Sequence, residues 1–301
     1  MDGSFSDVIR KYLTSPAFDE REPATQYNYR RALTDAEVGL GFLSVEVIKP
    51  KLVQEYLDGW AHLPGKQAVA KGALLALQKW AVVRGHLPFP IMTGTQTVGS
   101  DGGHEPWSDA EIETAIAHAR PDLGRAIALA INTGQRGSDI VKMRWSDIEE
   151  QEGRQGINVT QKKTGKQLWI PFTSDFSGEV AQWEKRPPFY LVLAPDGVQF
   201  TRNRLSHDWT KERDSNPELA SHKERGLVLH GLRASTVVRL RKLVFNELEI
   251  SNFIGMSLPM VVRYSRFANQ KKMALATVER LENYRGQAEK RKQTFGERSA
   301  R

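Results

Sequence analysis

The first ninety residues carry apolar side chains at helical spacing in four separate runs. An apolar residue at every third or fourth position forms a stripe along one side of a helix, and that stripe packs against a core. The sequence therefore predicts four helices in residues 1–90. Their core-facing positions are expected to be Val8, Ile9, Tyr12 and Leu13 in the first helix, Thr25, Tyr29, Ala32 and Leu33 in the second, Val53, Leu57 and Trp60 in the third, and Leu74, Leu77, Gln78, Ala81 and Val82 in the fourth.

A second set of helical runs begins after residue 104. Ser108 is a candidate N-cap for the first of these helices. Residues 123–131 are apolar on nearly all sides, which is typical of a helix buried in the middle of a domain. That helix is expected to break at residues 132–134, and a short helix over residues 138–145 is expected to follow.

One stretch has the pattern of two short strands. Residues 157–160 and 168–172 are β-type runs joined by Gln-Lys-Lys-Thr-Gly-Lys-Gln, with Gly165 in the turn. This arrangement predicts an antiparallel hairpin with Lys163 near its tip. Residues 173–226 contain several turn signals and are expected to be mostly loop.

Three more helices are predicted near the C-terminal end. Apolar positions from Leu232 to Val244 define the first, and residues 248–254 define a second that ends at Gly255. Ser257 is placed to cap the third helix, which carries Tyr264 on its apolar side. A lone tyrosine in such a stripe ordinarily belongs to the core, so a chemical role for it needs further support.

Two domains are expected, because residues 93–104 are rich in Gly, Ser and Thr and have no apolar period. Such a segment is typical of a linker. The first domain would comprise residues 1–92 and the second residues 105–301. The polar tail beyond Arg285 includes the basic residues 290–292 and is expected to be mobile or to dock on a partner.

Charge favours a polyanionic partner. The chain has 43 Lys and Arg against 36 Asp and Glu, a formal net charge of +7, which is typical of nucleic-acid binding proteins without proving that role. Arg30, Lys66, Lys71 and Lys162 are candidates for contacts with DNA. Each of them also fits an ordinary solvated surface.

Several classes of site are excluded. There is no cysteine, so disulfides, thiolate catalysis and Cys-based zinc sites are ruled out. The segment Gly59–Lys66 departs from the spacing of a nucleotide-binding loop, and the histidines lack a metal-binding spacing, so we expect no cofactor and no metal. The N-terminus does not have the pattern of a signal peptide, and the apolar run 126–131 is too short to cross a bilayer. We therefore expect a cytoplasmic protein with no membrane partner.

Groups suited to a phosphate lie near the starts of two predicted helices. His230 and Arg233 are three residues apart, so they share one face at a helix N-terminus, which favours anions. Arg136 stands at the entrance of another helix. Asp139, three residues on, is placed to orient that guanidinium.

Taken together, four segments resemble the ordered signature of the tyrosine recombinase (phage integrase) family. They are residues 133–139 (TGQRGSD), 163–165 (KTG), 230–233 (HGLR) and 263–264 (RY). The likeness covers roughly residues 105–285, and residues 1–90 are similar to the family's helical core-binding (SAM-like) domain. The resemblance implies a mainly α fold with a small β-sheet, built as a two-domain clamp on double-stranded DNA.

The resemblance also implies a reaction that needs neither ATP nor metal. Tyr264 would attack the scissile phosphate to give a 3′-phosphotyrosyl bond and a free 5′-hydroxyl, and the 5′-hydroxyl of another strand would reseal the junction. His230 would assist proton transfer from the tyrosine. Lys163, rather than the adjacent Lys162, would protonate the leaving 5′-oxygen.

By the same resemblance, Arg136 and Arg233 would hold the non-bridging oxygens, with Asp139 steadying the first of them.

One position departs from the family pattern. The family normally adds a donor, His or Trp, nine residues before the tyrosine, whereas this chain has Met256 eight residues before it. Methionine cannot donate, so the neighbouring Ser257 is a candidate replacement.

The function expected is site-specific DNA recombination or integration, in a homo-tetramer on DNA. Two alternatives stay open. A catalytically impaired DNA-binding relative is favoured by the methionine, and a type IB topoisomerase-like relaxing enzyme shares the chemistry. The small helical first domain and the basic tail favour a recombinase. A separate arm-type DNA-binding domain is not expected, because the first helix begins almost at the N-terminus.

Overall fold

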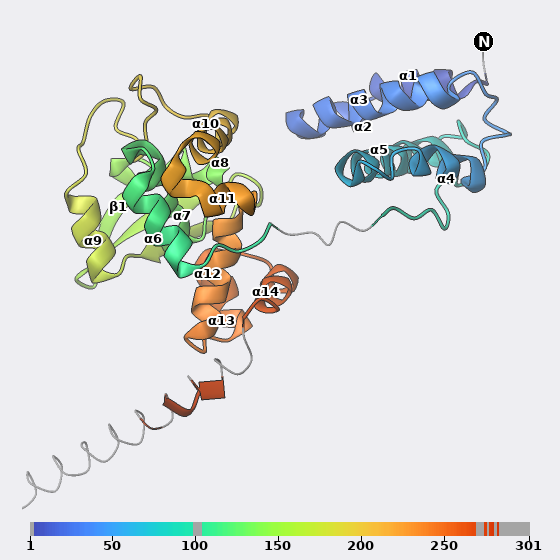
Figure 1. The fold of residues 1–301 in the computed structure, drawn as a ribbon. Helices are drawn as coiled ribbons and strands as arrows, with labels where there is room; N and C mark the ends of the chain where they lie inside the picture. Colours follow the sequence, from blue (N-terminus) through green and yellow to red (C-terminus); the bar gives the residue numbers. More distant parts are fainter. Residues whose placement is uncertain (1–2, 99–103, 269–273, 276, 280–281, 283–301) are drawn as a thin grey trace, which may run out of the picture. The chain divides into compact units, whose positions relative to one another are not determined.

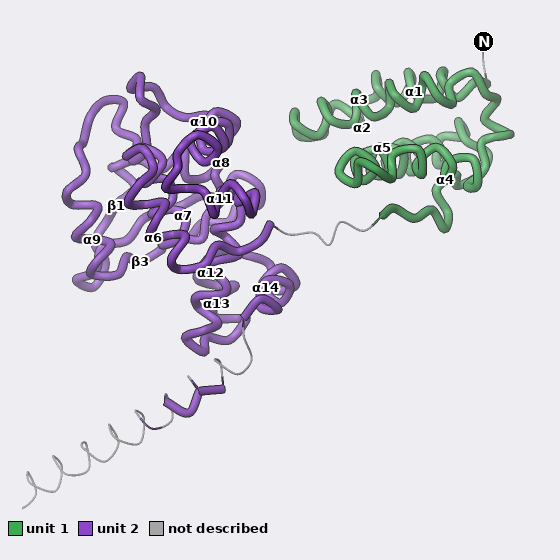
Figure 2. The backbone as a smooth tube through the Cα atoms, in the orientation of Figure 1, with its two compact units in different colours: residues 1–102 green, residues 103–301 purple. Residues whose placement is uncertain are grey.

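The computed structural model describes residues 3–98, 104–268, 274–275, 277–279 and 282. The chain forms two compact units, residues 1–102 and 103–301 (Figure 2). Helices dominate both units, and the second also holds a small antiparallel sheet (Figure 1). The predicted fold class, mainly α with a small β-sheet, is confirmed. Within these described segments, no helix has both the length and the apolarity needed to cross a membrane.

Unit 1 is a bundle of helices around one apolar core that includes Leu33, Leu57, Leu74 and Leu77. The four predicted helices are confirmed. Trp60 lies beyond the end of the third predicted helix, which spans Pro50–Asp58 in the structure. The helices are α1 (Phe5–Leu13), α2 (Pro16–Asp19), α3 (Pro23–Leu40), α4 (Pro50–Asp58) and α5 (Pro64–Val83). A proline in the first turn of α2, α3, α4 and α5 fixes where each begins, since that position needs no N–H.

Part of the predicted linker is bound to unit 1. Lys71 Nζ donates to the carbonyl of Thr95 at 2.9 Å, and the amide of Val98 donates to Gln67 Oε1 at 2.8 Å. Side-chain hydrogen bonds of this kind leave no apolar period, so the sequence pattern does not reveal them. Residues 99–103 of the predicted linker and the basic residues 290–292 lie outside the described residues.

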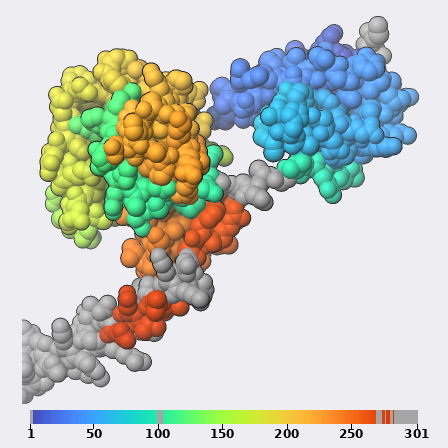
Figure 3. All heavy atoms as spheres, viewed as in Figure 1, coloured from blue at the N-terminus to red at the C-terminus, as the bar shows by residue number. Residues whose placement is uncertain are grey.

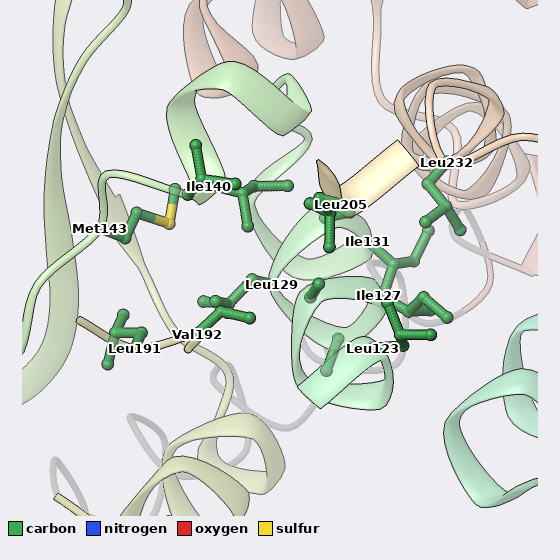
Figure 4. Close-up of a cluster of buried hydrophobic side chains, with 14 of the residues drawn as sticks. Leu123, Ile127, Leu129, Ile131, Ile140, Met143, Leu191, Val192, Leu205 and Leu232 are labelled. Atoms are coloured by element: carbon green, nitrogen blue, oxygen red, sulfur yellow. The ribbon is translucent and has the colours of Figure 1, made fainter. Parts of the chain in front are cut away.

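Unit 2 is built around α7 (Pro121–Thr133), which is buried on nearly every side as predicted. Figure 4 shows Leu123 and Ile127 of this helix among apolar side chains from other elements, including Leu205 and Leu232. The surrounding helices are α6 (Asp109–His118), α8 (Gly137–Ile140), α9 (Ser174–Ala181), α10 (Arg202–Ser215), α11 (Ala220–Glu224), α12 (Gly231–Lys242), α13 (Glu247–Ile254) and α14 (Leu258–Ser265), with short 3₁₀ turns η1 (Trp145–Asp147) and η2 (Pro217–Leu219).

The sheet contains the predicted hairpin. Strands β2 (Arg154–Thr160) and β3 (Gln167–Pro171) pair with Ile157 opposite Ile170, and Gly165 turns the chain with φ of 66°. A further strand, β1 (Ile148–Gln151), pairs with the other edge of β2. The sequence does not predict β1, because it reads Ile-Glu-Glu-Gln and has no alternating pattern.

Residues 173–226 are not mostly loop, and this prediction is wrong. They contain α9, α10 and α11, and the α10–α11 segment forms part of the surface of unit 2 seen in orange in Figure 3. α10 buries only Leu205 and Trp209 and is polar elsewhere, so apolar spacing does not predict a helix there. Trp209 is held by a hydrogen bond from its Nε1 to the carbonyl of Leu227 at 2.8 Å.

Two other helix predictions fail at their ends. The helix expected over residues 138–145 ends at Ile140. The helix expected to run to Val244 ends at Lys242, so Leu243 is exposed and Val244 adopts a left-handed conformation with φ of 63°. The apolar period continues past the point where the backbone leaves the helix.

A tight turn at Gly255 joins α13 to α14. Gly255 has φ of 64°, and a Cβ there would lie 2.5 Å from Leu168 Cδ1 and 2.8 Å from Gln161 Nε2. Only glycine fits both the backbone conformation and the space. Ser257 occupies the N-cap position of α14 as predicted, but its side chain makes no capping hydrogen bond.

Replacing Gly255 by alanine is expected to destabilise unit 2 by about 3 kcal/mol. About 1–2 kcal/mol comes from the left-handed backbone, and about 1–3 kcal/mol from the collision with Leu168 and Gln161. Gly153→Ala is the matched control, because Gly153 has φ of 73° but open space around its Cβ. Urea unfolding followed by tryptophan fluorescence measures both losses. Equal losses in the two variants would contradict the packing contribution.

Candidate active site

Two arginines lie together where α7 ends. Arg136 occupies the N-cap position of α8, and Arg233 lies in the first turn of α12 with only 3% of its surface exposed. Arg233 Nη1 donates a hydrogen bond to the carbonyl of Gly134, which ends α7 in a left-handed conformation. Burial and the charge of Arg136 lower the pKa of Arg233 to about 10.

Both guanidiniums keep unused donors. Arg136 Nη1 and Arg233 Nη2 are buried and have no hydrogen-bond partner among the described residues. Buried N–H groups are ordinarily paired, and two adjacent cations are stabilised by an anion. The arrangement therefore suits an oxyanion that accepts from both side chains.

His230 is half-buried at the start of α12, next to these arginines. Its ring meets the ring of His104 edge-on, with centroids 5.1 Å apart and planes at 80°. Burial lowers the pKa of His230 to about 4, helped by the positive charges of His104, Arg233, Arg136 and Arg202. The imidazole is thus neutral at pH 7.

Tyr264 lies on α14, which packs against α12. Its side chain is 3% exposed and belongs to a small apolar cluster with Ile254, Met256 and Val261. It is close enough to Arg233 for its charge to raise the pKa of that guanidinium. The tyrosine therefore belongs both to a core stripe and to the cationic site.

Lys163 lies in the turn between β2 and β3 and is exposed. The hairpin reaches the arginine site through Asp139, whose Oδ1 accepts a hydrogen bond from the amide of Lys162 at 2.9 Å. The predicted contact of Asp139 with the Arg136 guanidinium is not formed: among the described residues the two side chains make no ion pair. The carboxylate of Asp139 contacts the hairpin backbone instead.

The position that departs from the expected pattern is filled by a packed side chain. Met256 is 4% exposed, and its backbone carbonyl accepts a hydrogen bond from Ser251 Oγ at 2.7 Å. Ser257 is exposed at the start of α14. Met256 thus contributes apolar contact in the cluster that holds Tyr264.

The basic residues singled out in unit 1 all have partners within that unit. Lys66 Nζ lies 2.9 Å from Asp35 Oδ2 and 3.4 Å from the centre of the Trp60 ring. Lys71 donates to the Thr95 carbonyl, and the Arg30 guanidinium stacks on Phe18 at 5.1 Å. Arg30 and Lys66 are both exposed, but Arg30 makes no ion pair with the described residues, so of these three it has the freest access to a ligand.

His104, Arg202, Gln135 and Gln161 are parts of the site that the sequence analysis does not predict. His104 lies in the predicted linker, and the chain beside it is fixed to α12 by a hydrogen bond from the Trp107 amide to Ser235 Oγ at 2.7 Å. Arg202 begins α10, in a segment predicted to be loop. The two glutamines could have been found, since Gln135 stands inside the motif 133–139 and Gln161 two residues before the motif 163–165.

Known proteins resemble this chain in sequence and in fold. The sequence model described as "Phage integrase family" matches residues 109–271. The integrase of Escherichia phage HK022 is 34% identical over 116 residues, which cover 36% of this chain and 31% of that protein. The matched segments cover less than half the length of the integrases of phages HK022, 434 and lambda.

Solved structures share the fold. A lambda integrase dimer bound to a COC′ core site superposes with a TM-score of 0.69 at 20% identity, covering 87% of this chain and 77% of the other. A lambda integrase tetramer bound to a Holliday junction gives a TM-score of 0.67 at 20% identity, covering 84% and 77%.

The low pKa of His230 predicts a pH-dependent stability. An unfolded histidine takes up a proton near pH 6.5, whereas native His230 does so near 4. Unfolding therefore binds a proton between these values, and the native protein loses stability as the pH falls from about 6.5 toward 4. A His230→Gln variant is expected to lose less over that window, as measured by urea unfolding at about pH 7 and about pH 5. An NMR titration of His230 with a midpoint close to 6.5 would contradict this expectation.

Proposed function

Because the chain belongs to the phage integrase family, we propose that it is a site-specific DNA recombinase that cuts and rejoins DNA through a 3′-phosphotyrosyl intermediate at Tyr264. The observation that carries the proposal is the pair of unused donors on Arg136 and Arg233, beside Tyr264 and a neutral His230. A scissile phosphate supplies the missing acceptors. It also brings its phosphorus to the tyrosine.

The proposed reaction conserves the phosphodiester energy. The Tyr264 oxygen forms a bond to phosphorus as the bond to the 5′-oxygen breaks. His230 assists removal of the phenolic proton, which matters because a free tyrosine has a pKa of about 10; the negative charge of the bound phosphate would offset the arginine charges that keep the pKa of His230 low in the free protein. Lys163 delivers a proton to the leaving 5′-oxygen. A 5′-hydroxyl from another strand then displaces the tyrosine, so neither ATP nor a metal is required.

The two arginines would act mainly in the transition state. Negative charge grows on the non-bridging oxygens as the tyrosine attacks, and donors already in place stabilise it without reorganisation. The burial of Arg233 strengthens this effect, because a charge interacts more strongly where water is excluded. Removing one such donor typically costs about 3–4 kcal/mol of transition-state stabilisation.

Unit 1 is proposed to be a helical DNA-binding domain over residues 1–92, with residues 105–301 as the catalytic domain. The net charge of +7 supports a DNA partner. Exposed Arg30 and Lys162 are the candidates for contacts, whereas Lys66 and Lys71 would have to leave their present partners.

We also propose that the chain clamps double-stranded DNA and works as a homo-tetramer, by analogy with the lambda integrase tetramer on a Holliday junction.

Covalent capture tests the proposal. Wild type and a Tyr264→Phe variant would be mixed with nicked genomic DNA fragments and denatured, and protein-linked DNA would be recovered and sequenced. We expect linkage by the wild type and none by the variant, because phenylalanine lacks the attacking oxygen. The recovered sequence identifies the recognition site. Tight binding without linkage by the wild type would overturn the catalytic proposal in favour of a DNA-binding relative.

Met256 is expected to support the tyrosine by packing. Met256→Leu nearly conserves volume and should cleave the captured site at close to the wild-type rate. Met256→His places a polar ring in the apolar cluster and should lower both stability and cleavage, by about 1–3 kcal/mol in unfolding free energy. Thermal unfolding and single-turnover cleavage measure the two effects. Faster cleavage by the histidine variant would instead mean that the site lacks a donor.

A further inference from the structure

Two buried glutamines join three of the four segments that carry the proposed catalytic groups. Gln161 is fully buried and Gln135 is 2% exposed. Gln135 precedes Arg136, and Gln161 stands two residues before Lys163. Both side-chain amides donate to the carbonyl of Ile254 at 3.0 Å, at the end of α13 and just before the turn into α14.

Gln161 is the centre of this network. Its Nε2 donates to Gln135 Oε1 at 2.8 Å as well as to Ile254, and its Oε1 accepts from the Thr164 hydroxyl at 2.8 Å. Its backbone spans the hairpin loop, with its amide donating to the Lys166 carbonyl at 2.9 Å and its carbonyl accepting from Gly165 at 2.8 Å. A buried amide with this many satisfied bonds fixes the groups around it.

The network anchors the loop that carries Lys163. The lysine is exposed, but the residue on each side of it is anchored to a buried group. The Lys162 amide donates to Asp139, and the Thr164 hydroxyl donates to Gln161. The loop that carries Lys163 is therefore held at two points, one at Asp139 and one at Gln161.

The same side chain also reaches the segment before the tyrosine. Gln161 packs against Gly255, where a Cβ would lie only 2.8 Å from its Nε2. The carbonyl of Ile254 accepts from both glutamines, so both of its lone pairs are used. A displacement of the hairpin would break these bonds and release the turn that leads into α14.

We propose that Gln161 is a positioning residue that locks the Lys163 hairpin to the turn before the Tyr264 helix. Proton donor and nucleophile then reach one phosphate in a single geometry. This inference rests on the recombinase function proposed above and adds a residue to its machinery. It assigns no chemistry to Gln161 itself.

A sulfur-substituted substrate distinguishes this role from general damage. A leaving thiolate needs no proton, because the pKa of a thiol is about 8.5. DNA with sulfur in place of the scissile 5′-oxygen should therefore restore cleavage to an enzyme whose Lys163 is misplaced. The substrate would be a nicked duplex carrying the sequence recovered by covalent capture. Lys163→Ala, which lacks the proton donor altogether, sets the largest ratio of sulfur to oxygen cleavage that can be expected.

Gln161→Leu is expected to cleave the oxygen substrate about ten- to a hundredfold more slowly than wild type, because correct proton delivery contributes a factor of that order or more. On the sulfur substrate most of that loss should disappear, and the loss that remains measures the effect on the Tyr264 helix. Thr164→Val removes one exposed link of the network and should show a smaller loss with the same rescue. It keeps the proposal testable if the leucine variant folds poorly.

Gln67→Leu is the matched control. Gln67 is equally buried and donates to the Leu57 carbonyl at 3.0 Å, but it lies in unit 1. Its ratio of sulfur to oxygen cleavage should equal that of wild type. An equal loss on both substrates in Gln161→Leu would overturn the proposal.

Amide hydrogen exchange in the free protein tests the coupling without DNA. Residues 161–166 and 254–258 should exchange faster together in Gln161→Leu, and neither segment should change in Gln67→Leu. Faster exchange in only one segment would overturn the coupling even in an active enzyme. If the wild type links no DNA, the recombinase function fails, and the exchange result alone then decides whether the hairpin and the turn are joined.

Discussion

The burial of the Arg233 guanidinium is the constraint on which the rest of the site depends, because a buried charge needs acceptors or an opposite charge. Taking a charge out of water costs free energy unless hydrogen bonds or an opposite charge offset it. Arg233 finds one acceptor in the carbonyl of Gly134, which is available because α7 ends there in a left-handed turn. Arg136 adds positive charge, and a donor on each arginine stays unused. The surrounding fold therefore keeps two positive charges and their unused donors together, and the natural complement of that arrangement is a phosphate.

The apolar pattern predicts those helices that bury one wide stripe. α3, α7 and α12 are of this kind, and their existence follows from spacing alone. The pattern fails for α10, whose two buried side chains sit on an otherwise polar helix, and for β1, which is held by pairing with β2. It also overruns the end of α12, because the left-handed turn at Val244 is a property of the backbone.

Among the site residues too, sequence spacing predicts some features and misses others. Arg136 and Arg233 lie close enough to His230 to lower its pKa, and Tyr264 lies close enough to Arg233 to affect the pKa of that guanidinium. The contacts that orient them are not predictable from spacing. Asp139 lies three residues from Arg136, yet its carboxylate accepts from Lys162, 23 residues away. Gln161 reaches Ile254 across 93 residues, a contact that exists only once the hairpin has packed on α13.

The unused donors also affect how the free protein responds to its solution. Small oxyanions such as inorganic phosphate or sulfate would occupy the arginine pair in the folded chain and find no such pair in the unfolded one. By mass action they would raise the melting temperature. In the proposed reaction the same ions would occupy the place of the scissile phosphate. A storage buffer that preserves this protein best would therefore also inhibit the proposed reaction, and long shelf life and fast strand cleavage would call for different salts.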